Sequence, residues 1–357
     1  MLVVIGLLGV VGAEIILRRQ QTEIARSNHM DPNLVAYDAE LGWRLVPYAE
    51  GAHTNHDFSV RYTISPRGLR ADTPNPPRRS GRKLTLAIGD SFTFGLGVKD
   101  DETFLHRLDA KSAAGFDYLN AAVPGYSPDQ EWLLLQKQLW EVEPGRVLLF
   151  VYVGNDLLDL ERDVPLQLRS PKPRFEVVGN ELVLRNVPVP VRSEARVQPW
   201  WPVVLGADMS TWSWRTRLDL RYELFRWVAP PFPAERDYRP EFPARFASAL
   251  TLFERIIDRL ANACAQHGAE LKVVLIAGAA YLQAPASSSG QYQEFFCQQI
   301  GQRLPPMGVP VIQLPDLMRA RYRREGGKWF FPHDGHLTVK GHEVVAELLA
   351  AELARPR

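Results

Sequence analysis

Cysteine is scarce in this sequence, which has two among its 357 residues. This number excludes a disulfide scaffold and any cysteine-rich zinc site. Cys264 and Cys297 could form one disulfide in an oxidising compartment, and two buried free thiols are the alternative that we favour. An excess of either charge is also missing, since Lys and Arg total 42 while Asp and Glu total 41. This balance argues against nucleic acid as the main partner, because binding to phosphates needs a basic excess.

Signatures of cofactor and metal binding are missing as well. The sequence has neither a phosphate-binding loop nor a dinucleotide fingerprint, so we predict no cofactor. His53 and His56, with Asp57 beside them, resemble a metal-binding pair, but no further ligand is evident and we predict no metal site. What is present is an ordinary globular composition, with 46% apolar and 23% charged residues, which excludes wholesale disorder.

The N-terminal segment is apolar over residues 1–17 except for Glu14, and Arg18 and Arg19 follow it. Seventeen residues are close to the minimum for a helix that spans a hydrocarbon core of about 30 Å. We favour a membrane anchor over residues 1–19. A cleaved signal peptide lacks a basic region before the apolar run and an A-x-A site after it, and a buried helix is the third alternative. The positive-inside rule would place the body of the protein in the cytoplasm, but charge alone leaves the orientation open.

Two short regions precede the main domain. Residues 31–66 alternate between turns and short apolar segments, which predicts a small β element. Residues 74–83 are polar and rich in proline, as expected for a linker. We assign residues 30–83 to this β lead-in and linker.

Buried strands then alternate with helices. A continuous apolar run such as residues 84–88 is typical of a strand that is buried on both faces. We expect strands at 84–88, 116–123, 146–153, 271–276 and 309–313, and helices at 103–113, 127–142, 246–266, 292–304 and 338–353. This alternation predicts a three-layer α/β/α sandwich around a central parallel sheet, formed by residues 84–159 and 245–357.

Residues 160–244 interrupt this rhythm and read as an insertion, a possible lid. Twelve of the 28 prolines lie between Pro165 and Pro243, and residues 175–184 predict a β-hairpin. Five of the nine tryptophans are Trp200, Trp201, Trp212, Trp214 and Trp227. They could stack on sugar rings or line an acyl pocket, but we favour a small hydrophobic core of the insertion or packing near a membrane.

Four short motifs follow strands or precede a helix of the predicted sheet: GDSFTFG (89–95), PGYS (124–127), GND (154–156) and HDGH (333–336). Parallel sheets place their ligand sites at the carboxyl edge, where Ser91 would lie. Taken alone, each motif is an ordinary turn or helix cap. Together they bring a hydroxyl, a backbone N–H at Gly125, a carboxamide at Asn155 and an imidazole to one edge.

These four motifs resemble blocks I, II, III and V of the SGNH/GDSL hydrolase superfamily, in the order of that family. The apolar N-terminus, LGWRL-P and SPRGLR resemble its membrane-anchored bacterial members, which favours an extracytoplasmic catalytic domain, periplasmic or at the cell surface. The resemblance covers residues 84–159 and 245–356. One departure is the D-x-H spacing of Asp334 and His336, where most members have D-x-x-H; the shorter spacing is similar to that of alginate-type polysaccharide O-acetyltransferases.

The resemblance implies a role for each matched residue. Ser91 would be the nucleophile, His336 the general base, and Asp334 the carboxylate that orients His336. The oxyanion hole would consist of the N–H groups of Ser91 and Gly125 and the side chain of Asn155. His333 fits neither spacing and is read as a surface residue or a neighbour of the site. Asp90 and Asp156 are expected to bond within their turns, and His342 to pack away from the site.

These roles imply a serine esterase that acts on O-acyl groups, possible substrates being acetylated carbohydrates or small esters, through an acyl-serine intermediate. An O-acyltransferase that uses the same residues is the first alternative. A carbohydrate-binding or assembly protein without activity is the second, although a binding protein has no need for a nucleophile and a base.

Overall fold

The computed structural model describes residues 9, 11–13, 15–16, 27–72, 81–111, 115–166, 168, 170–179, 181–191 and 239–355. Most of the predicted anchor, most of the linker and the five tryptophans between Trp200 and Trp227 lie outside these residues. No helix within the described ranges is long and apolar enough to cross a membrane.

The core of the protein is a five-stranded parallel sheet with the strand order β12-β11-β8-β6-β7. The strands are β6 (Lys83–Ile88), β7 (Phe116–Asn120), β8 (Arg146–Tyr152), β11 (Glu270–Ile276) and β12 (Val311–Gln313). Five of the six residues in β6 are buried, as expected for a strand with helices on both faces. The predicted α/β architecture with a parallel sheet is confirmed, and each expected strand is present with small shifts of its ends.

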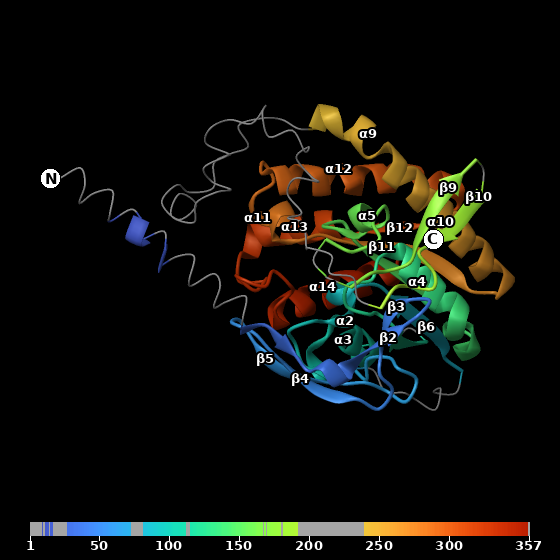
Figure 1. Cartoon of the computed structure of the whole chain (residues 1–357), viewed down its shortest axis with the longest axis horizontal. Coiled ribbons are helices and arrows are strands. Elements are labelled where there is room, and N and C mark those ends of the chain that lie inside the picture. The colour runs from blue at the N-terminus through green and yellow to red at the C-terminus, as the bar shows by residue number, and fades with distance from the viewer. Residues whose placement is uncertain are drawn as a thin grey trace.

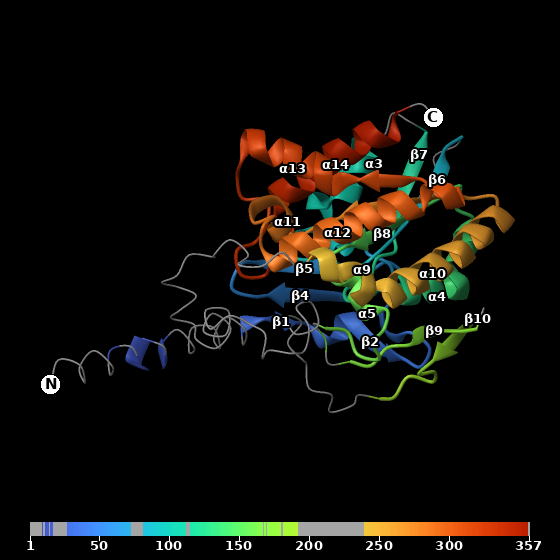
Figure 2. The ribbon, with the colours of Figure 1, turned by 90° about the horizontal axis from the view of Figure 1, so that it is seen from above.

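Helices cover both faces of this sheet (Figures 1 and 2). Figure 2 shows α3, α13 and α14 together on one side and α4, α10 and α12 on the other. Their bounds are α3 (Phe104–Lys111), α4 (Pro128–Leu134), α10 (Ala247–Gln266), α12 (Ser288–Arg303), α13 (Leu314–Glu325) and α14 (Val339–Leu353). The helical stretch expected over 127–142 is confirmed: α4 ends at Leu134, and a π-helical turn (Leu135–Leu139) and a 3-10 turn (Trp140–Val142) continue it.

The strand order places a switch point between β6 and β8. The chain leaves β6 towards β7 and leaves β8 in the opposite direction, towards β11. Loops at the carboxyl ends of two such strands diverge and leave a crevice between them, which is where open α/β sheets bind ligands. The GDS motif follows β6 and the GND motif follows β8, so both flank this crevice.

Short antiparallel strands from the N-terminal part of the chain pack against the parallel sheet. Strands β1 (His29–Met30), β4 (Glu50–Thr54) and β5 (Ser59–Thr63) form one small sheet, and β2 (Val35–Asp38) and β3 (Gly42–Leu45) form a hairpin. Their buried side chains, among them Trp43 and Tyr62, belong to the same hydrophobic core as the parallel sheet. The β element expected over 31–66 is therefore present, whereas the division of the chain into domains stays a prediction.

Two further expectations are settled by the structure. Strands β9 (Arg174–Val178) and β10 (Glu181–Arg185) form the hairpin predicted over 175–184. Cys264 and Cys297 are both buried and free, which confirms the favoured interpretation of the cysteines.

Candidate active site

Ser91 lies at the carboxyl end of β6, at the first position of the short helix α2 (Ser91–Phe94). Asp90 is the N-cap of this helix, and its Oδ1 accepts a hydrogen bond of 2.9 Å from the Phe92 N–H, as predicted for a turn residue. Position 89 has no room for a side chain, because a Cβ on Gly89 would lie 2.5 Å from Thr93 Oγ1. The turn therefore packs tightly against the sheet and fixes the direction of the Ser91 side chain.

The imidazole of His336 lies between Ser91 and Asp334. His336 Nε2 is 2.7 Å from Ser91 Oγ, and His336 Nδ1 is 2.5 Å from Asp334 Oδ1. The side chains of His336 and Asp334 are 14% and 12% exposed, so both groups are largely shielded from water. Burial acts to raise the pKa of Asp334, but the hydrogen bond and charge of His336 outweigh it and hold this pKa below its ordinary value. The D-x-H spacing thus brings the two side chains together.

Gly125 and Asn155 line the same cavity as Ser91. Gly125 has a φ of +81°, and a Cβ there would lie 2.2 Å from Leu168 Cδ1, so only glycine fits this turn. Asn155 Nδ2 donates one hydrogen to Asp159 Oδ2 at 2.7 Å, and an amide nitrogen carries a second hydrogen. The two residues lie where the sequence predicted them, and their role in an oxyanion hole stays a prediction.

The cavity has a volume of about 580 Å³ and two kinds of wall. Apolar side chains form one part of it: Met30, Leu96, Pro124, Pro165 and Leu168. Polar groups besides the four motifs form another: Asn28, His53 and Asp159. Burial raises the pKa of Asp159 to about 6, so this carboxyl holds its proton to a higher pH than an exposed one.

Buried carboxyl groups lie behind the nucleophile loop. Burial raises the pKa of Asp90 to about 6. Burial and the negative charge of neighbouring acids raise the pKa of Glu131 and of Asp156 well above their ordinary values. Asp156 also accepts the Tyr152 N–H through Oδ2 at 2.7 Å, which confirms that it bonds within its turn. These raised pKa values limit the negative charge that develops behind Ser91.

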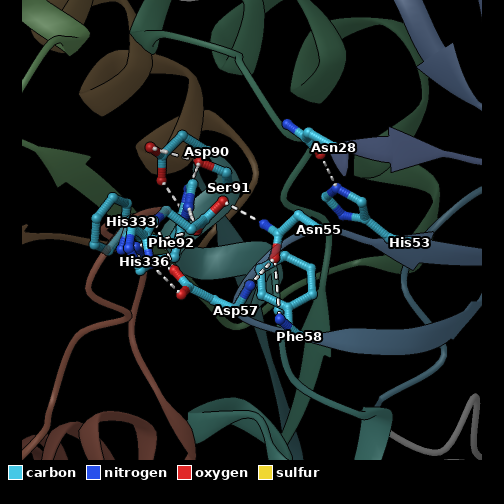
Figure 3. Close-up of polar contacts among 12 residues, drawn as sticks. Asn28, His53, Asn55, Asp57, Phe58, Asp90, Ser91, Phe92, His333 and His336 are labelled. Atoms are coloured by element: carbon cyan, nitrogen blue, oxygen red, sulfur yellow. Dashed lines mark hydrogen bonds and ion pairs between the residues drawn. The ribbon is translucent and has the colours of Figure 1, made fainter. Parts of the chain in front are cut away.

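Two residues from the β lead-in reach the loop of His336, and the sequence did not predict this (Figure 3). Asn55 Nδ2 donates to Asp334 Oδ2 at 3.0 Å, and the Asp57 carboxylate accepts the N–H groups of His333 and Asp334. His333 is thus a neighbour of the site, bound to Asp57. The sequence TNHDF between two strands indicates a turn, but no local pattern shows what a turn contacts.

No protein-family model and no curated protein matches this sequence. Solved structures with a similar course of the chain include a catalytic mutant of an acetylxylan esterase from Geobacillus stearothermophilus, with 10% identity, a TM-score of 0.44 and coverage of 78% of this chain and 100% of that one. A putative lipolytic protein of the G-D-S-L family from Desulfitobacterium hafniense DCB-2 has 12% identity, a TM-score of 0.39 and coverage of 76% and 99%.

A lipase/acylhydrolase from Enterococcus faecalis has 11% identity, a TM-score of 0.40 and coverage of 76% of this chain and 95% of its own. Identities of 10–12% and TM-scores of 0.39–0.44 do not assign a family or an activity to this chain. The resemblance to the SGNH/GDSL hydrolases therefore rests on the four sequence motifs and on the geometry around Ser91.

Proposed function

We propose that this protein is a serine esterase that cleaves O-acyl esters, with Ser91 as nucleophile, His336 as general base and Asp334 as the group that orients His336. One observation carries the proposal: the His336 ring contacts Ser91 Oγ through Nε2 at 2.7 Å and Asp334 through Nδ1 at 2.5 Å. A hydroxyl next to a base that a carboxylate holds in one tautomer is the arrangement that activates a serine.

The reaction would begin with the attack of Ser91 Oγ on the ester carbonyl carbon while His336 Nε2 takes the hydroxyl proton. The carbonyl oxygen would become an oxyanion that accepts hydrogen bonds from the N–H groups of Ser91 and Gly125 and from Asn155 Nδ2. Loss of one such donor typically costs about 2.7–4 kcal/mol of barrier. His336 would then return the proton to the departing alcohol, and water would hydrolyse the acyl-serine by the reverse sequence of proton transfers.

We infer an O-acylated carbohydrate, or a small ester of similar polarity, as the substrate. Asn28 and Asp159 in the lining support this inference, because an amide and a carboxyl group can bond the hydroxyl groups of a sugar. The apolar wall that includes Leu96 and Leu168 offers space for the acyl chain. Transfer of the acyl group to a sugar hydroxyl would use the same first half-reaction, with the acceptor in place of water.

The test is covalent labelling of the full-length chain with a fluorophosphonate, followed by mass spectrometry, beside a Ser91→Ala variant. We expect the adduct on Ser91, none in the variant, and hydrolysis of 4-nitrophenyl acetate and an acetylated oligosaccharide by the wild type alone. An oligosaccharide acceptor added at millimolar concentration separates hydrolysis from transfer by the ratio of free acetate to acetylated acceptor. A folded wild-type protein that neither reacts with the probe nor cleaves either ester would favour the binding-protein alternative instead.

A further inference from the structure

The turn between β4 and β5 contacts the loop that carries Asp334 and His336. This β4–β5 turn (residues 55–58) lies about 280 positions before the loop in the sequence, yet four hydrogen bonds join the two segments. In Figure 3 the side chains of Asn55, Asp57 and Phe58 lie beside those of His333 and His336. The Phe58 ring packs on Phe331 with 5.2 Å between ring centroids, which adds an apolar contact beneath the hydrogen bonds.

Asn55 presents its amide nitrogen to Asp334 because the turn fixes the other end of its side chain. Its Oδ1 accepts the N–H groups of Asp57 and Phe58 at 2.8 and 3.0 Å. An oxygen that accepts two backbone N–H groups cannot be exchanged with the amide nitrogen, so Nδ2 must point the other way. That nitrogen donates to Asp334 Oδ2 at 3.0 Å, while Asp334 Oδ1 accepts from His336. The two oxygens of Asp334 are therefore held by different partners.

Asp57 holds the backbone of the same loop. Its Oδ2 accepts the His333 and Asp334 N–H groups at 2.9 and 2.8 Å, and its Oδ1 lies 2.8 Å from His333 Nδ1. The Asp57 side chain is 5% exposed, so water competes little for these bonds. Two adjacent N–H groups on one oxygen fix the direction of the chain immediately before the Asp334 side chain.

Few hydrogen bonds within the loop itself would fix the orientation of the Asp334 side chain. Phe331 N–H donates to the His336 carbonyl at 2.8 Å, and Gly335 N–H donates to the Phe331 carbonyl at 3.0 Å. Neither bond reaches the Asp334 carboxylate. Within the loop its Oδ1 accepts from His336, through the ring and through the backbone N–H at 3.3 Å, whereas its Oδ2 accepts from Asn55. The orientation of that carboxylate depends on His336 itself and on Asn55.

We propose that Asn55 and Asp57 are positioning residues that hold Asp334, and through it His336, in the geometry that activates Ser91. The β lead-in is then a part of the active site and supplies what the short D-x-H loop does not provide for itself. The proposal builds on the proposed esterase activity. Its expected signature is a loss of kcat with little change of KM, since neither residue lines the cavity around Ser91.

Three substitutions separate positioning from mere stability of the turn. Asn55→Asp keeps an oxygen for the Asp57 and Phe58 N–H groups but replaces the donor to Asp334 by an acceptor. Asp57→Asn keeps an oxygen for the two backbone N–H groups of the loop, whereas Asp57→Ala removes it. Ser59→Ala is the matched control, because Ser59 bonds to Thr54 in the same hairpin and is exposed.

The measurements are kcat, KM and the pH profile of kcat/KM on the full-length chain, together with the downfield ¹H signal of the His336 ring N–H bound to Asp334. For Asn55→Asp we expect a fall of kcat of about tenfold or more, KM within about twofold, and a loss or shift of the His336 signal. The acid limb of kcat/KM should move to higher pH, because the new carboxylate adds to the negative charge of Asp334 and Asp90 near His336 and so stabilises the protonated imidazole, while burial lowers the pKa of His53 to about 4 and keeps that ring neutral. Asp57→Ala should behave similarly, and Asp57→Asn should recover most of the activity.

Each outcome decides the proposal. Wild-type kinetics, an unmoved pH profile and an unchanged His336 signal in Asn55→Asp would overturn it, and so would equal losses in Asp57→Asn and Asp57→Ala. If Asp57→Ala does not fold, Asn55→Asp decides alone. If the wild type lacks esterase activity, the His336 signal still reports whether Asn55 holds the Asp334–His336 pair, so failure of the esterase proposal is distinct from failure of this one.

Discussion

His342 is a histidine that the protein keeps neutral in its core, six positions beyond His336. It is 1% exposed, its Nδ1 accepts the Phe104 N–H at 3.2 Å, and its ring stacks on Phe104. Protonation of Nδ1 would replace this acceptor by a donor that faces another donor. Burial, with the positive charges of Arg70 and Arg107, lowers the pKa of His342 to about 3. The expectation that His342 packs away from the site is confirmed.

We predict that His342 makes the protein less stable as the pH falls. In the unfolded chain this histidine takes up a proton near pH 6.5, whereas in the folded protein it does so only near pH 3. Its contribution to the free energy of unfolding is therefore complete above pH 6.5. Below this pH the contribution is lost at about 1.4 kcal/mol per pH unit. His342→Asn retains an acceptor for Phe104 and does not titrate. Urea unfolding at pH 7, 6, 5 and 4.5 should show the wild type losing stability relative to the variant, and parallel pH curves would contradict the prediction.

Arg70 joins two elements, the end of the β lead-in and the helix that carries Ser91. Its buried guanidinium donates to the carbonyl oxygens of Phe94, Gly95 and Val98 at 2.7, 2.7 and 2.8 Å, and it pairs with Asp100 at 3.0 Å. The charge also lies over the Phe94 ring, 4.5 Å from its centroid. The carbonyls at the end of α2 thus have a single side chain as a common donor, and the planar fork of arginine is what reaches all of them.

We predict that Arg70→Met lowers the free energy of unfolding by about 3 kcal/mol or more, because buried carbonyl groups lose their donor. Arg70→Lys should recover only part of this, since an ammonium group cannot reproduce the fork. Both variants should react more slowly with a fluorophosphonate at Ser91, since α2 loses its fixed end. Arg61→Ala is the control: Arg61 lies in β5 of the same lead-in, is 70% exposed and pairs with Glu50 at 4.0 Å, so about 0.5 kcal/mol or less is expected. Equal effects of the Arg61 and Arg70 variants on urea unfolding would rule the prediction out.

At the scale of the whole molecule, the sequence predicted what depends on local pattern. The buried strands are continuous apolar runs, and each motif around Ser91 directly follows a strand or precedes a helix, so the topology alone brings them to one edge. Helix α13 was missed because its buried side chains end at Met318, after which ion pairs such as Arg321 with Glu347 hold it. Asn55 and Asp57 were missed because their role depends on a contact across about 280 residues, which turn chemistry does not encode.

The last prediction concerns where the whole molecule resides. We propose that residues 1–19 anchor the protein in a membrane, with the domain that contains Ser91 outside the cytoplasm. An arginine at the centre of a spanning helix costs about 2.5–3.5 kcal/mol, so the double variant Leu8→Arg/Val11→Arg should lose insertion. After expression in bacteria, we expect the full-length chain in the membrane pellet after a carbonate wash and the variant in the soluble fraction. Protease added to spheroplasts should remove a C-terminal tag from the wild type, as from a known periplasmic control. If the carbonate wash releases the wild-type chain from the pellet, the anchor is excluded. If protease removes the tag only after the cells are lysed, the domain lies in the cytoplasm, as the positive-inside rule alone predicts.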